Sequence, residues 1–369
     1  MPATRPTKAR KRRIGDGKSV RLTDVARQAD VSTTTASRVF ITPDKVRPEI
    51  IYRVRAVADK LGYVPNSAAR ALRSRRTRMI GAIIPTLSHS IYATEVEAIQ
   101  KTLHASGYSL VITTSDYRLD KEYEQARILM ERGIEGLVLV GDEHDPRLYR
   151  LIKDQGVPYI NTYVYEPDAR HACVGFDNRL AAKKITNHLL DLGHTRIAMI
   201  AGISAHNDRA RERIEGVREA LQNRGLTMTD RLLTEKPYDI ASGRQALRYL
   251  WSANPKPTAI VCGSDVLAFG ALAECVSLQI TVPRQLSIVG FDNLEFAGHL
   301  TPALTTLQVP AEEMGERAAS FLVRQLSGKQ EVEYIELESN LILRETTCPP
   351  LEMMEGQTLN PGQVLESVG

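Results

Sequence analysis

Short hydroxyl side chains and one arginine share a face of the segment 33–40, and this combination of groups can bind nucleic acid. Apolar residues within the segment recur at helical spacing, so the remaining positions form a polar helix face. That face carries Thr33, Thr34, Ser37 and Arg38. An arginine can donate two hydrogen bonds to the edge of a guanine, and hydroxyls can bind phosphates or base edges. A solvated polar helix is the alternative interpretation of the pattern.

For this face to enter a DNA groove, a helix and a tight turn must come before it. Apolar residues recur every three or four positions between Leu22 and Ala29, which predicts a first helix. Asp30 tolerates the left-handed backbone of a tight turn, and Ser32 is a favourable N-cap for the second helix. The sequence therefore predicts a helix-turn-helix whose second helix reads the major groove.

A third helix is predicted to begin at Pro48 and to end at Gly62. Proline is favourable in the first turn of a helix, and glycine is favourable just after the last one. The inner side of this helix carries Ile50, Ile51, Val54, Val57, Ala58 and Leu61. We therefore expect three helices to close a small hydrophobic core.

From residue 78 onward, short apolar runs alternate with helical patterns. Buried strands are predicted over 79–84, 109–113, 136–140, 157–160, 172–175, 196–200, 258–262 and 286–290, and helices over 92–106 and 120–132. This alternation is typical of parallel sheets covered by helices on both faces. The stretch is too long for one comfortable core, so two α/β lobes are expected.

Together these segments resemble the lactose-repressor and galactose-repressor family of bacterial transcription regulators. The resemblance covers roughly residues 20–348. Its words, in chain order, are LTDVARQADVSTTTASRVF, LGYVPN, AARALRS, TRMIGAIIP, VGFDNRLAA, LGHTRIAMI, RERIEG, SDVLAFGA and LSIVGFDN. Their order and separation are those of the family.

The resemblance implies a three-helix helix-turn-helix head with a hinge helix, and a periplasmic-binding-protein-like α/β effector domain of two doubly wound parallel-sheet lobes. The implied segments are a basic disordered arm (1–19), a DNA-binding domain (20–65), a hinge helix and linker (66–77), an effector-binding and dimerisation domain (78–348) and a disordered tail (349–369). Lobe one would comprise 78–189 and 310–337, and lobe two 190–309 and 338–348.

DNA contacts implied by the resemblance fall on the helix-turn-helix and on the hinge. Leu72 matches the leucine that the family inserts into the minor groove, where it bends the duplex. So short a hinge helix does not persist alone in water, so it must depend on DNA and on a second copy of the chain. The implied DNA-binding residues are Leu22, Thr23, Ser32, Thr33, Thr34, Thr35, Ser37, Arg38, Asn66, Ala69 and Leu72.

Candidate effector-binding residues follow the predicted strands, where doubly wound sheets bind their ligands. They are Pro85, Thr86, Tyr92, Asp177, Ser264 and Asp292, and Arg213 lies in the segment after 196–200. The resemblance implies that Arg213 clamps the effector and that Asp177 and Asp292 accept hydrogen bonds from sugar hydroxyls. It also implies that Tyr238 packs on the ligand, whereas Pro85 and Ser264 depart from residues that are common in the family.

Each of the charged candidates has a purely structural alternative. Asp177 can cap the helix that follows it, and Asp292 can satisfy loop backbone. Arg213 can instead pair with Glu212 or Glu215 on a wet surface, where such a pair contributes little. The joint arrangement after successive strands favours a pocket over these separate explanations.

The effector is expected to be a sugar acid such as gluconate. The words VGFDN and AECVSLQITVP look like the gluconate-repressor branch, and Arg211 and Arg213 lie near the predicted crevice. The simplest mechanism is a repressor that the effector releases from its operator. A co-repressor-dependent or activating member of the family with a different metabolite effector is the alternative.

Charge separates the chain into a basic front and an acidic body. Residues 1–78 carry 20 Lys or Arg against 6 Asp or Glu, a balance of +14, and the rest carries 28 against 38, a balance of −10. A basic head of this kind is typical of a nucleic-acid module attached to a second function. A free sugar-binding protein would lack residues 22–78, and an architectural DNA-binding protein would need no crevice.

Other signals bound the function further. There is no phosphate-cradling glycine motif, no HExxH and no GxSxG, so we expect neither an enzyme nor a cofactor. The four cysteines form no CxxC pair, and no apolar run suits export or a membrane span, so a cytoplasmic protein without a metal is expected. The expected partners are operator DNA, the effector and a second copy in a homodimer. The tail has no heptad repeat for a tetramer.

Overall fold

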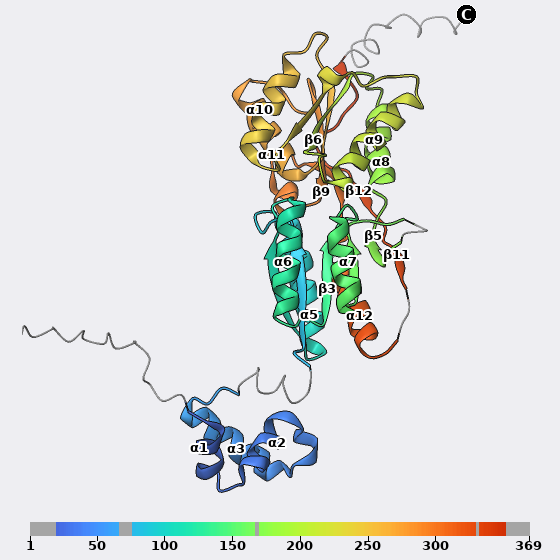
Figure 1. Ribbon diagram of the computed structural model, residues 1–369. Coiled ribbons are helices and arrows are strands. Elements are labelled where there is room, and N and C mark those ends of the chain that lie inside the picture. The colour runs from blue at the N-terminus through green and yellow to red at the C-terminus, as the bar shows by residue number, and fades with distance from the viewer. Residues whose placement is uncertain (1–19, 66–75, 167–169, 330–331, 352–369) are drawn as a thin grey trace, which may run out of the picture. The chain divides into compact units, whose positions relative to one another are not determined.

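The computed structural model describes residues 20–65, 76–166, 170–329 and 332–351 (Figure 1). The chain forms two compact units, Met1–Thr77 and Arg78–Gly369. The expected basic arm, the expected hinge residues Asn66, Ala69 and Leu72, and most of the expected tail lie outside the described residues.

Within its described residues 20–65, the first unit contains three α-helices, as the sequence predicts. They are α1 (Leu22–Gln28), α2 (Thr33–Ile41) and α3 (Pro48–Leu61), with the short 3-10 helix η1 (Pro43–Lys45) between the last two. Their shared core contains Val25, Ala26, Ala29, Ala36, Val39, Val54 and Ala58. The small size of these side chains allows the three helices to approach closely.

Local signals define the turn and the ends of these helices. Asp30 has a φ of +50°, in the left-handed region that the tight turn requires. The Oγ of Ser32 accepts a hydrogen bond of 3.0 Å from the backbone N of Thr35, which satisfies a donor at the start of α2. Gly62 ends α3 with a φ of +65°. These three sequence predictions are confirmed.

Two six-stranded sheets form the second unit (Figure 1). The first has the order β11-β5-β4-β3-β1-β2 and the second β12-β10-β9-β8-β6-β7. The first sheet contains β1 (Met79–Ile84), β2 (Ser109–Thr114), β3 (Gly136–Val140), β4 (Tyr159–Thr162), β5 (Cys173–Gly175) and β11 (Tyr334–Glu336). The second contains β6 (Ile197–Gly202), β7 (Leu233–Lys236), β8 (Ala259–Cys262), β9 (Ser287–Asp292), β10 (Thr305–Gln308) and β12 (Asn340–Ile342). Neighbouring strands are parallel, except β10 and β12.

Four of these strands were not among the predicted ones. β7, β11 and β12 lie at sheet edges and are partly exposed, so they lack the continuous apolar run of a buried parallel strand. β10 is mostly buried but reads TTLQ, and its threonines hide it from a search for apolar runs. The predicted parallel sheets are correct apart from the antiparallel β12.

Helices cover the faces of both sheets (Figure 1). The first sheet is covered by α5 (Ser90–Ala105), α6 (Leu119–Glu131), α7 (Pro146–Gln155) and α12 (Ala311–Leu326). The second sheet is covered by α8 (Asn178–Asp191), α9 (Asp208–Gln222), α10 (Ile240–Trp251) and α11 (Asp265–Ser277). The same lobe contains the 3-10 helices η2 (Asp230–Leu232) and η3 (Glu295–His299).

The expected boundary of the first lobe at residue 189 is wrong, because α8 packs with the second lobe. It lies along α9 and contacts β8 and β10 of the second sheet. The chain therefore changes lobes directly after β5. Gly216 permits this close helix pair, since a Cβ atom there would lie 2.3 Å from the carbonyl oxygen of Arg179 in α8.

We predict that Gly216→Ala destabilises the second unit by about 1–3 kcal/mol, because the added methyl meets rigid helix backbone. The midpoint of urea-induced unfolding measures the loss. Arg218→Ala on the exposed side of the same helix is the control and should change stability by less than about 0.5 kcal/mol. Equal unfolding midpoints for Gly216→Ala and the parent would show that the two helices can separate without cost.

Candidate functional site

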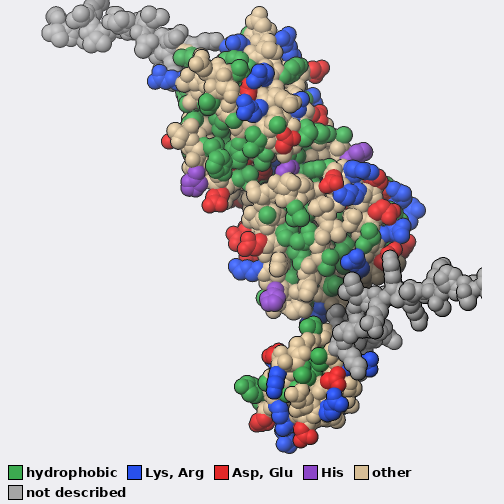
Figure 2. Space-filling model, turned by 90° about the vertical axis from the view of Figure 1, so that its left-hand side faces the viewer, with side chains coloured by type: hydrophobic (Ala, Val, Ile, Leu, Met, Phe, Trp, Pro, Cys, Tyr) green, Lys and Arg blue, Asp and Glu red, His purple; other side chains and the backbone are tan. Residues whose placement is uncertain are grey.

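The polar face of α2 presents most of the groups that its sequence predicts. Thr33, Thr34 and Arg38 are exposed, and Thr35 is half-buried. Ser32 is exposed as well, although its Oγ is occupied by the helix cap. Figure 2 shows Lys and Arg side chains on the surface of this unit. An exposed guanidinium beside threonine hydroxyls can bind a base edge and the neighbouring phosphates.

Two of the expected DNA contacts differ from the simple helix pattern. Ser37 is only 8% exposed, so its expected outward orientation is wrong. On a helix of 3.6 residues per turn Ser37 lies about 60° from Phe40, and the buried stripe is wide enough to include both. Leu22 packs partly against the core of the head, whereas its neighbour Thr23 is exposed.

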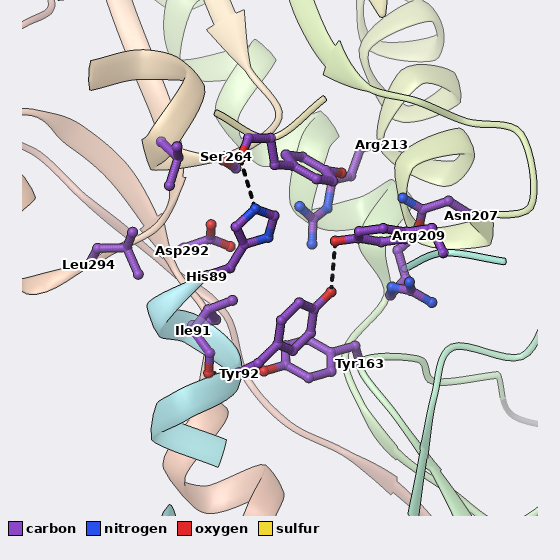
Figure 3. Close-up of a pocket in the computed structure, with 13 residues that line it drawn as sticks. His89, Ile91, Tyr92, Tyr163, Asn207, Arg209, Arg213, Ser264, Asp292 and Leu294 are labelled. Carbon is purple, nitrogen blue, oxygen red and sulfur yellow. Dashed lines mark hydrogen bonds between the residues drawn. The ribbon is translucent and has the colours of Figure 1, made fainter. Parts of the chain in front are cut away.

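In the second unit, five of the predicted effector residues line one pocket between the two lobes (Figure 3). They are Tyr92, Arg213, Tyr238, Ser264 and Asp292. The remaining lining residues are His89, Ile91, Tyr117, Tyr163, Asn207, Arg209, Val266 and Leu294. The pocket lies beyond the carboxyl ends of strands from both sheets, where ligands of such folds bind.

Arg213 is the buried cation of this pocket. Its Nε donates to Asn178 Oδ1 at 2.9 Å and its Nη1 to the carbonyl of Gly263 at 2.8 Å. The guanidinium carbon lies 3.7 Å from the ring centroid of Phe291. Both hydrogen-bond acceptors are neutral, and the residue is 7% exposed. The side chain is therefore fixed by α8, β9 and the loop after β8 while its charge faces the pocket.

Asp292 at the end of β9 is the acidic counterpart. Its φ of +127° is rare for a residue with a side chain, and the residue is 8% exposed. Burial raises the pKa of Asp292 well above its ordinary value, the positive charge of Arg213 opposes this, and the negative charge of Asp265 adds to it. Burial therefore disfavours the charged form of Asp292, which limits how far this carboxyl can neutralise Arg213.

Tyr238 fills the space between the lobes from the second-lobe side. A Cβ atom at position 202 would lie 2.1 Å from the Tyr238 ring, so Gly202 is needed for the ring to lie where it does. His89 of the first lobe donates from Nε2 to the Tyr238 carbonyl at 2.8 Å, and the two rings meet edge to face. Burial lowers the pKa of His89, so this imidazole is predominantly neutral at neutral pH.

Sequence reasoning missed several pocket residues that a stricter use of its own rule would have found. Tyr117 follows β2 and Tyr163 follows β4, both with positive φ values just past a strand end. The rings of Tyr92 and Tyr163 meet edge to face on the first-lobe side of the pocket (Figure 3), and the Tyr117 hydroxyl lies 3.4 Å from that of Tyr92. Asn207 caps α9, and Arg209 lies one helical turn before Arg213.

The pocket is tight and contains one polar atom without a partner. Its cavity volume is about 30 Å³, close to the space of one water molecule. The Oγ of Ser264 is buried and has no hydrogen-bond partner among the described residues. A ligand of sugar size therefore needs the lobes or the aromatic side chains to move, and Ser264 can then bind it.

Three predicted effector residues lie elsewhere. Thr86 lines an outer groove of about 500 Å³ that shares His89, Tyr117 and Tyr238 with the pocket. Pro85 lines a neighbouring cavity of about 20 Å³. Asp177 is outside the pocket, and its Oδ1 accepts from the backbone N of Leu180 at 2.9 Å. The carboxylate of Asp177 thus caps α8 and lines a separate cavity, so the structure does not bring it together with the other predicted effector residues.

Arg211 also lies away from the pocket, contrary to expectation. It is exposed on α9 and its Nη1 donates to Glu143 at 2.8 Å. Arg209 instead supplies the second cation of the pocket, since side chains four residues apart share a helix face.

Among the described residues no cluster of His, Cys, Asp or Glu could hold a metal ion. Within those same ranges no helix has the length and apolar character needed to cross a membrane.

Two known protein families match this chain. Residues 21–66 match the lacI family of bacterial regulatory proteins, and residues 186–347 match the periplasmic binding protein-like domain. The first match covers the helix-turn-helix head. The second covers most of the second lobe and the return to the first.

Individual relatives extend over nearly the whole chain. The HTH-type transcriptional repressor PurR of Pectobacterium carotovorum is 30% identical over 328 residues, which are 88% of this chain and 96% of PurR. A lac repressor dimer bound to operator and the anti-inducer ONPF is 25% identical, with a TM-score of 0.79 over 90% of this chain and all of that one. A complex of the regulator CelR with cellobiose is 28% identical, with a TM-score of 0.66 over 89% and 99%.

The exposed reading helix, the two-lobed pocket domain and these relatives point to the same conclusion. This chain belongs to the lacI family of bacterial regulatory proteins, and it is a DNA-binding transcriptional repressor with an effector-binding domain.

Proposed function

We propose that this repressor acts as a homodimer whose affinity for its operator is set by a sugar acid, such as gluconate, bound between the lobes. The observation that carries the proposal is the environment of Arg213. Its guanidinium is buried and bonds to neutral oxygens, and burial disfavours the charged form of the neighbouring Asp292. A carboxylate on the ligand would supply the missing negative charge.

The rest of the pocket suits the remainder of such a ligand. Aromatic side chains surround the cavity, and the flat faces of sugars pack well on aromatic rings. Ser264 Oγ offers an unused hydrogen-bonding group, and burial favours the neutral form of the Asp292 carboxyl, which can both donate and accept. Cellobiose bound to CelR shows that a relative of this fold binds a sugar.

The link from ligand to DNA rests on the family's architecture. A homodimer places two reading helices in successive major grooves of a near-palindromic operator. In the proposed mechanism the hinge at Asn66, Ala69 and Leu72, outside the described residues, inserts Leu72 into the minor groove. A change in the angle between the lobes alters the spacing of the two hinges, and so alters operator affinity.

We predict that Arg38→Ala weakens binding to an operator selected from a random duplex library by roughly tenfold to a hundredfold, since a bidentate base contact contributes about 1–3 kcal/mol. Fluorescence anisotropy at fixed salt measures the affinity. Arg53→Ala, exposed on α3, is the control for loss of one positive charge and should have a much smaller effect on sequence preference. If both variants lose affinity equally for operator and random duplex, Arg38 contacts phosphate and does not read bases.

We predict that Arg213→Ala weakens gluconate binding by roughly a hundredfold or more, because the ligand carboxylate loses its buried partner. Isothermal titration calorimetry on the full chain measures the affinity. Arg211→Ala removes an arginine from the exposed rim of the same helix and should change it by less than about threefold, as for surface charge pairs. Heat released by neutral hexoses but not by gluconate or 2-ketogluconate would disprove the sugar-acid proposal.

The protonation of Asp292 makes gluconate binding dependent on pH. The pKa of Asp292 is raised in the folded protein, so its carboxyl is neutral below that raised pKa and becomes charged as pH increases through it. The ionised form repels the ligand carboxylate, so gluconate affinity should fall with rising pH. Asp265, whose pKa burial raises to about 6, and the neutral His89 are the nearby groups that also titrate. Titrations with Asp292→Asn should lose most of the pH dependence, and an unchanged slope would assign it to Asp265 or His89.

A further inference from the structure

A second buried arginine on α9 reaches out of its own lobe. The Nη1 of Arg209 donates to the carbonyl oxygen of Val140 in the first lobe at 3.1 Å and to Asp208 Oδ1 at 2.7 Å. The side chain of Arg209 is only 8% exposed. Val140 is the last residue of β3, so a second-lobe cation binds the carboxyl end of a first-lobe strand.

Asp208 joins the same two parts of the molecule. Its Oδ2 accepts from the backbone N of Asp142 at 2.8 Å, while its Oδ1 accepts from Arg209. The Asp208 carboxylate therefore bonds both to the backbone amide of Asp142 in the first lobe and to the Arg209 guanidinium. That guanidinium in turn bonds to the carbonyl of Val140 in the first lobe. Because all of these groups except Asp142 are largely shielded from water, their bonds are stronger than those of surface pairs.

The first-lobe turn between these contacts is shaped to receive the pair. Gly141 has a φ of +93°, and a Cβ atom there would lie 1.8 Å from Arg209 Nη1 and 2.7 Å from Asp208 Oδ1. Only glycine allows the turn and the ion pair to occupy this space together. The nearby pair of Glu143 with Arg211 also crosses the lobes, but its arginine is exposed and it contributes less.

Arg209 also lines the effector pocket, the cavity of about 20 Å³ beside Pro85 and the larger cavity of about 460 Å³ beside Asp177. Arg209 therefore joins the pocket to a contact between the lobes, as His89 also does through its bond to Tyr238. The pocket holds only about 30 Å³, so a ligand enters when the lobes move apart or when the aromatic side chains rotate. Breaking the bonds to Val140 and Asp142 is part of any such separation.

We propose that Asp208 and Arg209 form a clasp on the first-lobe turn 140–142, and that this clasp controls how readily the effector pocket opens. The proposal concerns the pocket of the proposed function but depends on no particular effector. An anionic ligand beside Arg209 competes with Val140 and Asp208 for its guanidinium, so the clasp connects occupancy of the pocket to the relative position of the lobes.

The test uses the full chain with Ser264→Cys as a reporter of pocket opening. Ser264 is 5% exposed, so modification of the introduced thiol by a soluble thiol reagent requires the pocket to open. Gly141→Ala adds a methyl group that displaces the guanidinium without deleting any atom. We expect it to accelerate modification of the reporter thiol, followed by mass spectrometry of its peptide, by at least about tenfold.

The matched control is Gly156→Ala, because Gly156 also has a positive φ in the first lobe but has nothing within 4 Å of its Cβ position. It imposes similar backbone strain without touching the clasp, so the modification rate of the reporter thiol should stay within about twofold of the parent. Equal acceleration by both alanines would assign the effect to strain and overturn the proposal. An unchanged rate in Gly141→Ala would overturn it as well.

A second pair of variants covers the case in which Gly141→Ala does not fold. Asp208→Ala removes the carboxylate that holds Asp142 and Arg209, although Asp208 itself does not line the pocket. It should accelerate modification of the reporter thiol as Gly141→Ala does. Glu212→Ala, one helical turn further along α9, breaks only the pair with Arg179 and should leave the rate unchanged. Neither measurement uses DNA or gluconate, so failure of the clasp and failure of the sugar-acid proposal give separate results.

Discussion

The buried charge of Arg213 is the constraint on which the effector domain depends. A guanidinium removed from water is costly unless its donors and its charge are satisfied. Asn178 and Gly263 satisfy two donors, and the ring of Phe291 packs against the cation. These groups come from the start of α8, the loop after β8 and the end of β9, so the cation holds the carboxyl ends of two central strands of the second sheet. Because burial disfavours the charged form of Asp292, part of the positive charge remains for a ligand.

The pocket and the contact between lobes are parts of one structure because both use the same helix. Arg213 and Arg209 lie one turn apart on α9, and the first faces its own lobe while the second reaches the end of β3. A ligand that changes the partners of one arginine acts on the helix that carries the other. This arrangement gives a physical route from ligand chemistry to the geometry of the two lobes, which is what allosteric control of DNA binding requires.

Features that depend on neighbouring residues in the sequence were predicted correctly, whereas features that depend on tertiary contacts were often predicted wrongly. Asp30, Ser32 and Gly62 were placed correctly, because turns and caps depend on a few neighbouring residues. β10 was missed because its threonines are buried by tertiary packing that an apolar run does not reveal. Asp177 and Arg211 stand close to pocket residues along the chain, yet one caps a helix and the other pairs at the rim.

The sequence by itself determined the helix-turn-helix, the alternation of strands and helices, the two lobes and the family, because periodicity, caps and motif words are local. Only the tertiary structure decided that α8 belongs to the second lobe, that Ser37 is buried and that Arg209 joins the pocket. Each of these depends on which side chains from distant segments occupy the same space. Gly141 is the clearest case, because the need for a residue without a Cβ atom there is apparent only when Arg209 of the other lobe is seen to pack against it.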